Sequence, residues 1–89
     1  MIKPEKSYML AHQAINTETI VYVRLLDEGV DVWRPVRATA QPDGTFKLVP
    51  PEKPDPTEVW EFPPHATVRC VQKTFEGGNK GLVAIAQTE

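Results

Sequence analysis

From residue 20 onward, apolar and polar residues alternate in short runs that are typical of β-strands. The run over residues 20–25 separates its odd positions from its even ones: Val21, Val23 and Leu25 against Tyr22 and Arg24. The run over residues 30–40 is apolar at its even positions except Arg34. Pro35 has no N–H for a β-ladder, so it indicates either a sheet edge or a bulge. We expect a bulge here, which would turn Trp33 inward.

Turn and loop residues divide the rest of the chain. Pro42-Asp43-Gly44 is typical of a hairpin turn, and the proline-rich stretch over residues 50–58 is incompatible with a helix or a central strand. The further predicted strands cover residues 46–48, 59–62, 66–75 and 82–86.

These elements predict an all-β fold: a small SH3-like barrel of five to six antiparallel strands over residues 19–89. A five-stranded oligonucleotide-binding barrel is the alternative. Residues 1–18 form a separate N-terminal arm in this interpretation. Pro4 permits a helix to start there, but the apolar spacing is irregular, so a short helix and a disordered arm are both open.

Composition and charge restrict the function classes. The chain has 89 residues, which suits one domain, with 10 Lys and Arg against 12 Asp and Glu. The net charge of −2 repels a phosphate backbone, so a nucleic-acid partner would need a local basic patch. The sequence shows no signal-like or membrane-spanning apolar run, and we expect a cytoplasmic protein with no membrane partner.

Two segments carry a family resemblance. The first contains Trp33-Arg34-Pro35-Val36 and the second contains Trp60-Glu61-Phe62-Pro63. Over roughly residues 20–86 the chain resembles a family of short, uncharacterised bacterial proteins in which both motifs occur on strands. A Gly commonly follows the last proline of the second motif in that family, whereas His65 stands there in this chain. The resemblance implies a small barrel, and it assigns no catalytic residue.

The same motifs supply the candidate binding site. Exposed aromatic rings beside an arginine are suited to docking a protein segment. The candidate residues are Trp33, Arg34, Trp60, Glu61 and Phe62. The alternative is that both tryptophans belong to the core, and that Arg34 and Glu61 form a structural cross-strand pair.

Other constellations give weaker signals. The acidic residues Glu52, Asp55 and Glu58 lack the spacing of a calcium loop. Cys70 lies on the apolar face of its strand, so a nucleophile pair with His65 or His12 is disfavoured. We expect no catalytic residue, no metal site and no cofactor. A basic patch around Tyr22 would draw on Arg24, Arg34, Arg37, Arg69 and Lys73.

The sequence therefore predicts a non-catalytic protein-interaction module, a monomer or weak homodimer that docks a protein partner by aromatic contact and β-edge pairing. The alternatives are a nucleic-acid-binding barrel and an inhibitor or immunity-type protein. The sequence does not identify the partner.

Overall fold

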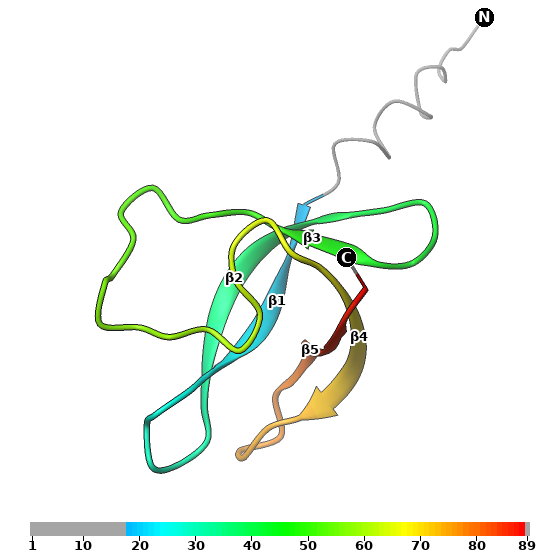
Figure 1. Cartoon of the computed structure of the whole chain (residues 1–89). Coiled ribbons are helices and arrows are strands. Elements are labelled where there is room, and N and C mark those ends of the chain that lie inside the picture. The colour runs from blue at the N-terminus through cyan, green and yellow to red at the C-terminus, as the bar shows by residue number, and fades with distance from the viewer. Residues whose placement is uncertain (1–17, 89) are drawn as a thin grey trace, which may run out of the picture.

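The computed structural model describes residues 18–88, which form five β-strands and no helix (Figure 1). The strands are β1 (Glu18–Leu25), β2 (Val32–Ala40), β3 (Phe46–Leu48), β4 (Thr67–Thr74) and β5 (Lys80–Gln87). They close into a barrel in sequential order. The predicted small all-β barrel is confirmed and is consistent with the SH3-like type. The sequential order differs from the Greek-key order of the oligonucleotide-binding barrel, so that alternative is wrong.

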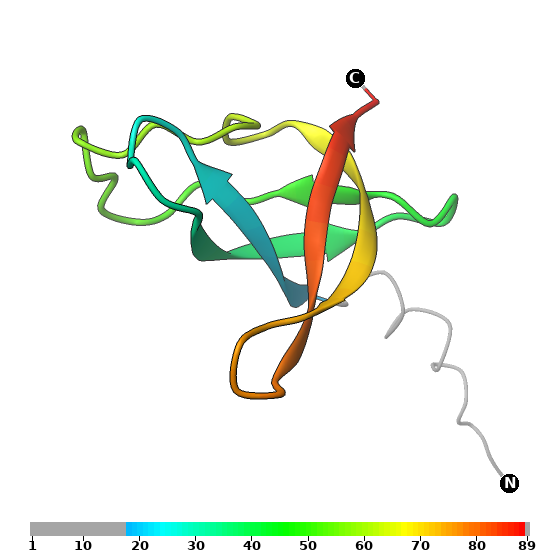
Figure 2. The same ribbon diagram turned by 90° about the horizontal axis from the view of Figure 1, so that it is seen from below.

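One strand pair departs from the predicted antiparallel pattern. β1 runs parallel to β5, with Val21 opposite Leu82 and Tyr22 opposite Val83. The cause is the strand number: when each strand reverses direction, the first and fifth strands run the same way. Figure 2 shows the β4–β5 hairpin crossing β2 and β3 at a steep angle. A register shift between Arg69 and Cys70 marks the point where β4 bends.

The inward face of each strand supplies the core. As predicted, the odd positions of β1 are buried, together with even positions of β2 and Val68 of β4. The buried cluster consists of Val21, Val23, Val36, Ala38, Leu48, Ala66, Val68 and Ala84. Trp60 and Phe62, which come from outside the strands, pack against it while remaining partly exposed.

The bulge predicted at Pro35 is wrong. β1 and β2 keep one continuous register from Glu18 opposite Thr39 to Leu25 opposite Val32. Pro35 is tolerated because it lies at a sheet edge, the other possibility that its missing N–H allows. β3 pairs only with the last three residues of β2, residues 38–40, so no strand pairs with Pro35 on that side. Without the bulge Trp33 stays on the outer face of β2.

The strand predicted over residues 59–62 is also wrong. The segment makes a single β-bridge, between Trp60 and Leu25. Two backbone hydrogen bonds support this bridge: Leu26 N–H donates to Val59 O at 2.7 Å and Glu61 N–H donates to Arg24 O at 2.8 Å. Prolines on both sides, Pro56, Pro63 and Pro64, lack the N–H groups that would extend the ladder.

His65 occupies a glycine-like position. Its φ is 75°, in the left-handed region, and its N–H donates to Leu48 O at 2.9 Å. A glycine would adopt this conformation without the strain that a β-carbon brings.

The predicted N-terminal helix or disordered arm lies outside the described residues, except that its last residue, Glu18, begins β1. None of the described residues belongs to a helix long and apolar enough to cross a membrane.

Candidate functional site

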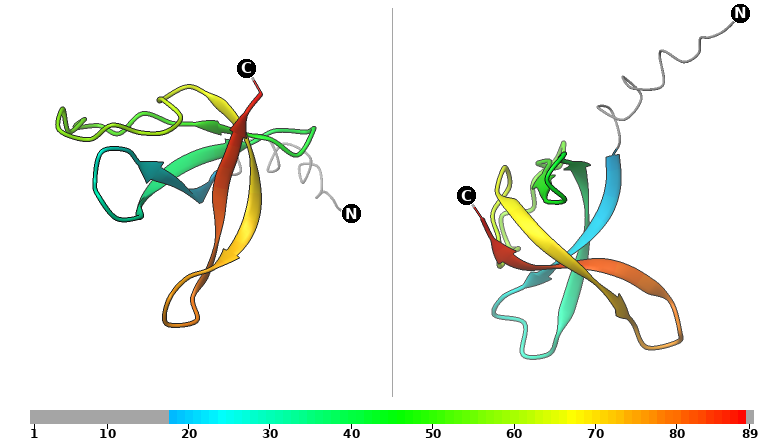
Figure 3. Two further views of the ribbon diagram at one scale, coloured as in Figure 1. Left: turned by 60° about the horizontal axis from the view of Figure 1, so that its bottom comes forward. Right: turned by 90° about the vertical axis from the view of Figure 1, so that its right-hand side faces the viewer.

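A long loop between β3 and β4, residues 49–66, forms one side of the candidate site, and we call it the proline loop. Figure 1 shows it extending away from the barrel beside β2, and Figure 3 shows it on the same side as the β1–β2 turn. It carries six prolines, which restrict its backbone and make it semi-rigid: Pro50, Pro51, Pro54, Pro56, Pro63 and Pro64.

One carboxylate fastens the proline loop to β2. Glu58 Oε1 accepts a hydrogen bond from Arg34 Nε at 3.1 Å and another from Trp60 Nε1 at 3.3 Å. The guanidinium carbon of Arg34 lies 5.9 Å from the centre of the Trp60 ring. The Arg34 and Glu58 side chains are 29% and 22% exposed, so water screens this pair less than it screens a surface ion pair.

The predicted Arg34–Glu61 pair is therefore wrong, because Glu58 takes the position expected for Glu61. An Asx turn at Asp55 fixes the backbone just before Glu58. In this turn Asp55 Oδ1 accepts hydrogen bonds from Thr57 N–H at 2.9 Å and from the Thr57 hydroxyl at 2.6 Å. Glu58 N–H then donates to Asp55 O at 3.1 Å. Glu61 is exposed, and its backbone is bound to β1.

The first of two open grooves, which we call the arginine groove, runs along the free edge of β2. Its volume is about 400 Å³. Its walls are mixed, with apolar residues from the strands and the proline loop and three charged residues. They are Ile20, Arg34, Pro35, Val36, Arg37, Val49, Pro51, Glu52 and Trp60.

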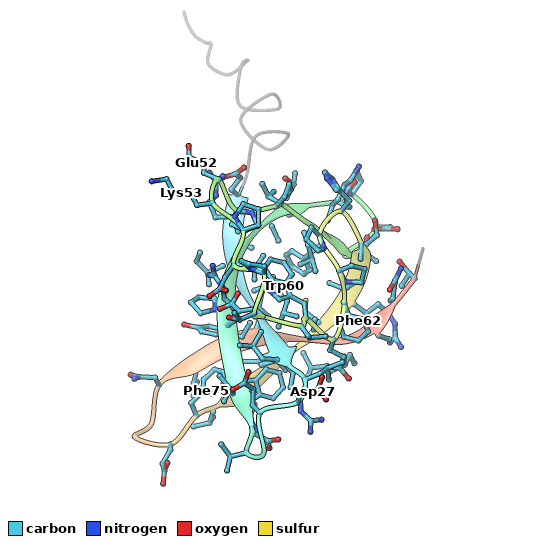
Figure 4. All side chains as sticks on the ribbon, turned by 60° about the vertical axis from the view of Figure 1, so that its left-hand side comes forward. Asp27, Glu52, Lys53, Trp60, Phe62 and Phe75 are labelled. Atoms are coloured by element: carbon cyan, nitrogen blue, oxygen red, sulfur yellow. The ribbon has the colours of Figure 1, made fainter. Side chains whose placement is uncertain are left out.

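The second groove, which we call the proline groove, has a volume of about 350 Å³ and lies within the proline loop. Its walls are Pro51, Pro54, Asp55, Glu58, Val59, Trp60, Pro63 and Pro64. The two grooves meet at Pro51 and Trp60, which line both. Figure 4 shows Trp60 on the side of the barrel that carries the proline loop, with Glu52 and Lys53 nearer the loop's tip.

The edge of β2 beside the arginine groove is partly blocked. Arg37 O accepts from Val49 N–H at 2.9 Å, so the odd residues of β2 direct their backbone groups toward the β3 side. On that side Pro35 offers no N–H, and its carbonyl accepts from Arg34 Nη1 at 2.7 Å. A partner strand therefore finds few pairing groups at Pro35, and side-chain contact is the better supported mode of docking.

Trp33 lies elsewhere. On the outer face of the sheet it meets Phe75 edge-on, with ring centres 6.2 Å apart, and Tyr22 lies 4.9 Å from the same Phe75 ring. We call Tyr22, Trp33 and Phe75 the outer aromatic cluster. Figure 4 shows Phe75 near the β4–β5 hairpin, away from the tip of the proline loop. The structure thus brings Arg34 and Trp60 together at Glu58, packs Phe62 against the core outside both grooves, and leaves Trp33 in the outer aromatic cluster.

The predicted basic patch around Tyr22 gathers only in part, because Arg24 stands opposite Trp33 in the β1–β2 register and Lys73 also lies near that ring. Arg24 pairs with Asp31 at 3.3 Å and Arg37 contacts Glu18 at 3.5 Å, while Arg34 lies in the contact with Glu58. Of the remaining two, Lys73 lies 5.9 Å from the Trp33 ring centre, and Arg69 is exposed on the same strand.

Cys70, one of the residues considered for catalysis, is partly buried. Partial burial raises the pKa of the Cys70 thiol from 9.0 to about 11, which keeps it protonated at neutral pH. His65 is exposed at its turn, and His12 lies outside the described residues. Within residues 18–88, no group of three or more His, Cys, Asp or Glu side chains could hold a metal ion.

Comparison with protein families, curated proteins and solved structures finds no match to this chain. The candidate site therefore rests on the geometry of the chain itself.

Sequence reasoning missed several residues of the site. The sequence pattern indicates Glu58 only as one of three acidic residues without calcium-loop spacing, whereas in the structure its carboxylate accepts a hydrogen bond from Trp60 Nε1. Ile20 and Val59 line the grooves and are 44% and 45% exposed. Exposure of aliphatic side chains is a tertiary property, so no local pattern could have identified them.

Proposed function

We propose that this chain is a non-catalytic protein-interaction module that binds an extended segment of a partner protein in the two grooves that meet at Trp60. The observation that carries the proposal is that two open grooves share Trp60, the arginine groove with mixed walls and the proline groove with mostly apolar ones. The Arg34–Glu58 contact holds the proline loop against β2 at this point. A partly exposed aromatic ring in a groove is the usual anchor for an extended segment.

Several features support this proposal over the rival classes. An SH3-like barrel, the type that we propose here, uses grooves lined by aromatic residues to bind extended segments. The raised pKa of Cys70 argues against nucleophilic catalysis. A nucleic acid would require Arg24 and Arg37 to exchange their carboxylate contacts for phosphates. The resemblance to short bacterial proteins supports a bacterial, cytoplasmic setting for the module.

The test is selection from a random-peptide display library against the full chain, followed by affinity measurement on groove variants. Ile20→Glu places a charge in the arginine groove and Val59→Glu places one in the proline groove. Each has a matched control outside both grooves at nearly the same exposure: Ile85→Glu and Val71→Glu, at residues 46% exposed.

We expect selected peptides to lose at least tenfold in affinity on the groove variants and to bind the controls as tightly as the original chain. The tenfold loss corresponds to about 1.4 kcal/mol, a typical value for a central interface contact. The proposal fails if no clone depends on either groove, or if the control variants lose as much affinity as the groove variants.

A further inference from the structure

The two grooves differ in their charged residues. The charged residues that line the proline groove are both acidic, Asp55 and Glu58. The arginine groove is lined by two basic residues, Arg34 and Arg37, and by the acidic Glu52. Because the grooves share Trp60, acidic and basic side chains lie along one continuous surface.

Two of these charges already neutralise each other. Arg34 and Glu58 are in contact at 3.1 Å, and Arg34 Nη1 also donates to the Pro35 carbonyl. A ligand that displaced this contact would have to leave a half-buried charge without its partner, which is costly. The Arg34–Glu58 contact therefore belongs to the framework of the site and not to its recognition surface.

Asp55 and Arg37 are the charges best placed to recognise a ligand. Arg37 contacts Glu18 at 3.5 Å, and the two side chains are 56% and 45% exposed. Replacing Glu18 by a carboxylate of the ligand therefore costs little free energy. Asp55 is exposed, and both hydrogen bonds from Thr57 go to Oδ1. These hydrogen bonds hold the pKa of Asp55 below its usual value of 3.8, so the side chain is a carboxylate at neutral pH.

The wall between the two charges is apolar. Trp60 and Pro51 form the shared part, Val59 lies on the side of the proline groove, and Val36 and Val49 lie on the side of the arginine groove. Apolar or proline residues of a ligand are suited to this central stretch.

We propose that the partner segment has a fixed charge order: a lysine or arginine opposite Asp55, apolar or proline residues over Trp60, and an aspartate or glutamate opposite Arg37. This inference rests on the proposed function and specifies the chemistry of its ligand. Charge complementarity at the two ends sets the direction of the segment, and the apolar centre provides the main binding energy.

The experiment uses the peptides that display selection returns for the full chain and that depend on Ile20 or Val59. We expect these peptides to be enriched in basic, apolar and acidic residues in that order, read in one constant direction along the chain. Asp55→Asn then weakens binding about 2- to 5-fold, as expected for one exposed ion pair. Arg37→Gln has an effect of similar size.

A double-mutant cycle tests whether the basic residue of the peptide contacts Asp55. Replacing the peptide's basic residue by norleucine should abolish the difference between the original chain and Asp55→Asn. Asp31→Asn and Arg69→Gln serve as charge-matched controls, since neither residue lines a groove, and we expect them to leave affinity unchanged.

The outcomes separate the two proposals. Groove-dependent peptides with no consistent charge order, or an unchanged affinity on Asp55→Asn and Arg37→Gln, would overturn the charge order while leaving the binding module intact. Absence of any groove-dependent peptide would overturn the proposed function and the charge order with it.

Discussion

At the scale of single residues, the site depends on one carboxylate oxygen. Glu58 Oε1 receives hydrogen bonds from both Arg34 and Trp60, so it links β2, the proline loop and the aromatic ring that both grooves share. Glu61, three residues later, is exposed. The two glutamates therefore give a direct comparison of a framework residue with a surface residue.

Glu58→Ala should destabilise the fold by about 1–2 kcal/mol, because it removes a charge-assisted hydrogen bond and leaves half-buried Arg34 without its carboxylate. Urea unfolding followed by tryptophan fluorescence measures the effect. Glu61→Ala is the control and should change stability by less than about 0.5 kcal/mol. Equal losses in both variants would contradict the assigned role of Glu58.

His65→Gly should stabilise the fold by about 0.5–1 kcal/mol, because φ at this residue is 75° and a glycine adopts that conformation without strain. The midpoint of thermal or urea unfolding reports the gain. His65→Ala keeps the β-carbon and should bring no comparable gain. If alanine stabilises as much as glycine, the imidazole and not the backbone is the source of the effect.

Cys70 should be slow to alkylate in the folded chain. A rise in pKa from 9.0 to about 11 lowers the thiolate fraction near neutral pH about 100-fold. Iodoacetamide labelling followed by mass spectrometry should show slow reaction of the native protein and fast reaction in urea. Similar rates in both conditions would contradict the burial assigned to this thiol.

At the scale of elements, the outer aromatic cluster depends on a glycine in β5. A β-carbon added to Gly81 would lie 2.7 Å from Tyr22 Cε1 and 3.1 Å from Phe75 Cε2. Tyr22 therefore packs directly on the backbone of the neighbouring strand. This contact braces the β4–β5 hairpin against β1 next to their short parallel pairing.

Gly81→Ala should cost about 1–3 kcal/mol of stability, since the Tyr22 ring must move to accept the methyl group. In a Tyr22→Leu background the same substitution should cost less, because the smaller side chain leaves room. Unfolding midpoints of the four proteins give the coupling. Equal costs in both backgrounds would show that Tyr22 is not what excludes a β-carbon.

Element prediction from the sequence succeeded where the pattern is local. The alternation in β1 and the turn at Pro42-Asp43-Gly44 reflect properties of neighbouring residues, and both were predicted. The strand predicted over residues 59–62 is wrong because the prolines on both sides, Pro56, Pro63 and Pro64, limit the segment to one bridge. The sequence favoured a bulge at Pro35 because it does not show how far β3 pairs along β2. In the structure this pairing is limited to residues 38–40, which leaves Pro35 at an edge.

Of the residues that the sequence predicted for the site, Arg34 and Trp60 line the grooves, whereas Phe62 packs against the core and Trp33 lies in the outer aromatic cluster. Both tryptophans follow strand-like patterns, but Trp33 faces outward from β2 whereas Trp60 packs against the core from the proline loop. Which carboxylate meets Arg34 depends on the path of that loop, which no periodicity describes.

At the scale of the whole molecule, two aspartates make stability depend on acid pH. Hydrogen bonds from Thr45 and Thr57 hold the pKa values of Asp43 and Asp55 below 3.8 in the folded chain. A folded-state pKa below the unfolded one gives stability that is complete above about pH 3.8 and is lost as the pH falls through the lower, folded value.

Urea midpoints measured across acid pH should therefore fall as these carboxylates are protonated. Asp43→Asn should flatten part of the decline, because its side chain no longer titrates. Asp27→Asn is the control, at an exposed residue of the β1–β2 turn. An acid decline that Asp43→Asn leaves unchanged would contradict the contribution assigned to that carboxylate.

The central claim is that a partner segment docks at Trp60 and not at Trp33, and the two indole N–H groups report on it directly. A ¹⁵N-labelled full chain is titrated with a selected peptide, and Trp33→Phe assigns the two indole signals. We predict that the Trp60 signal shifts with the binding curve while the Trp33 signal stays in place, because only Trp60 lines the grooves. A shift of the Trp33 signal with Trp60 unmoved would place the binding surface on the outer aromatic cluster and contradict the account.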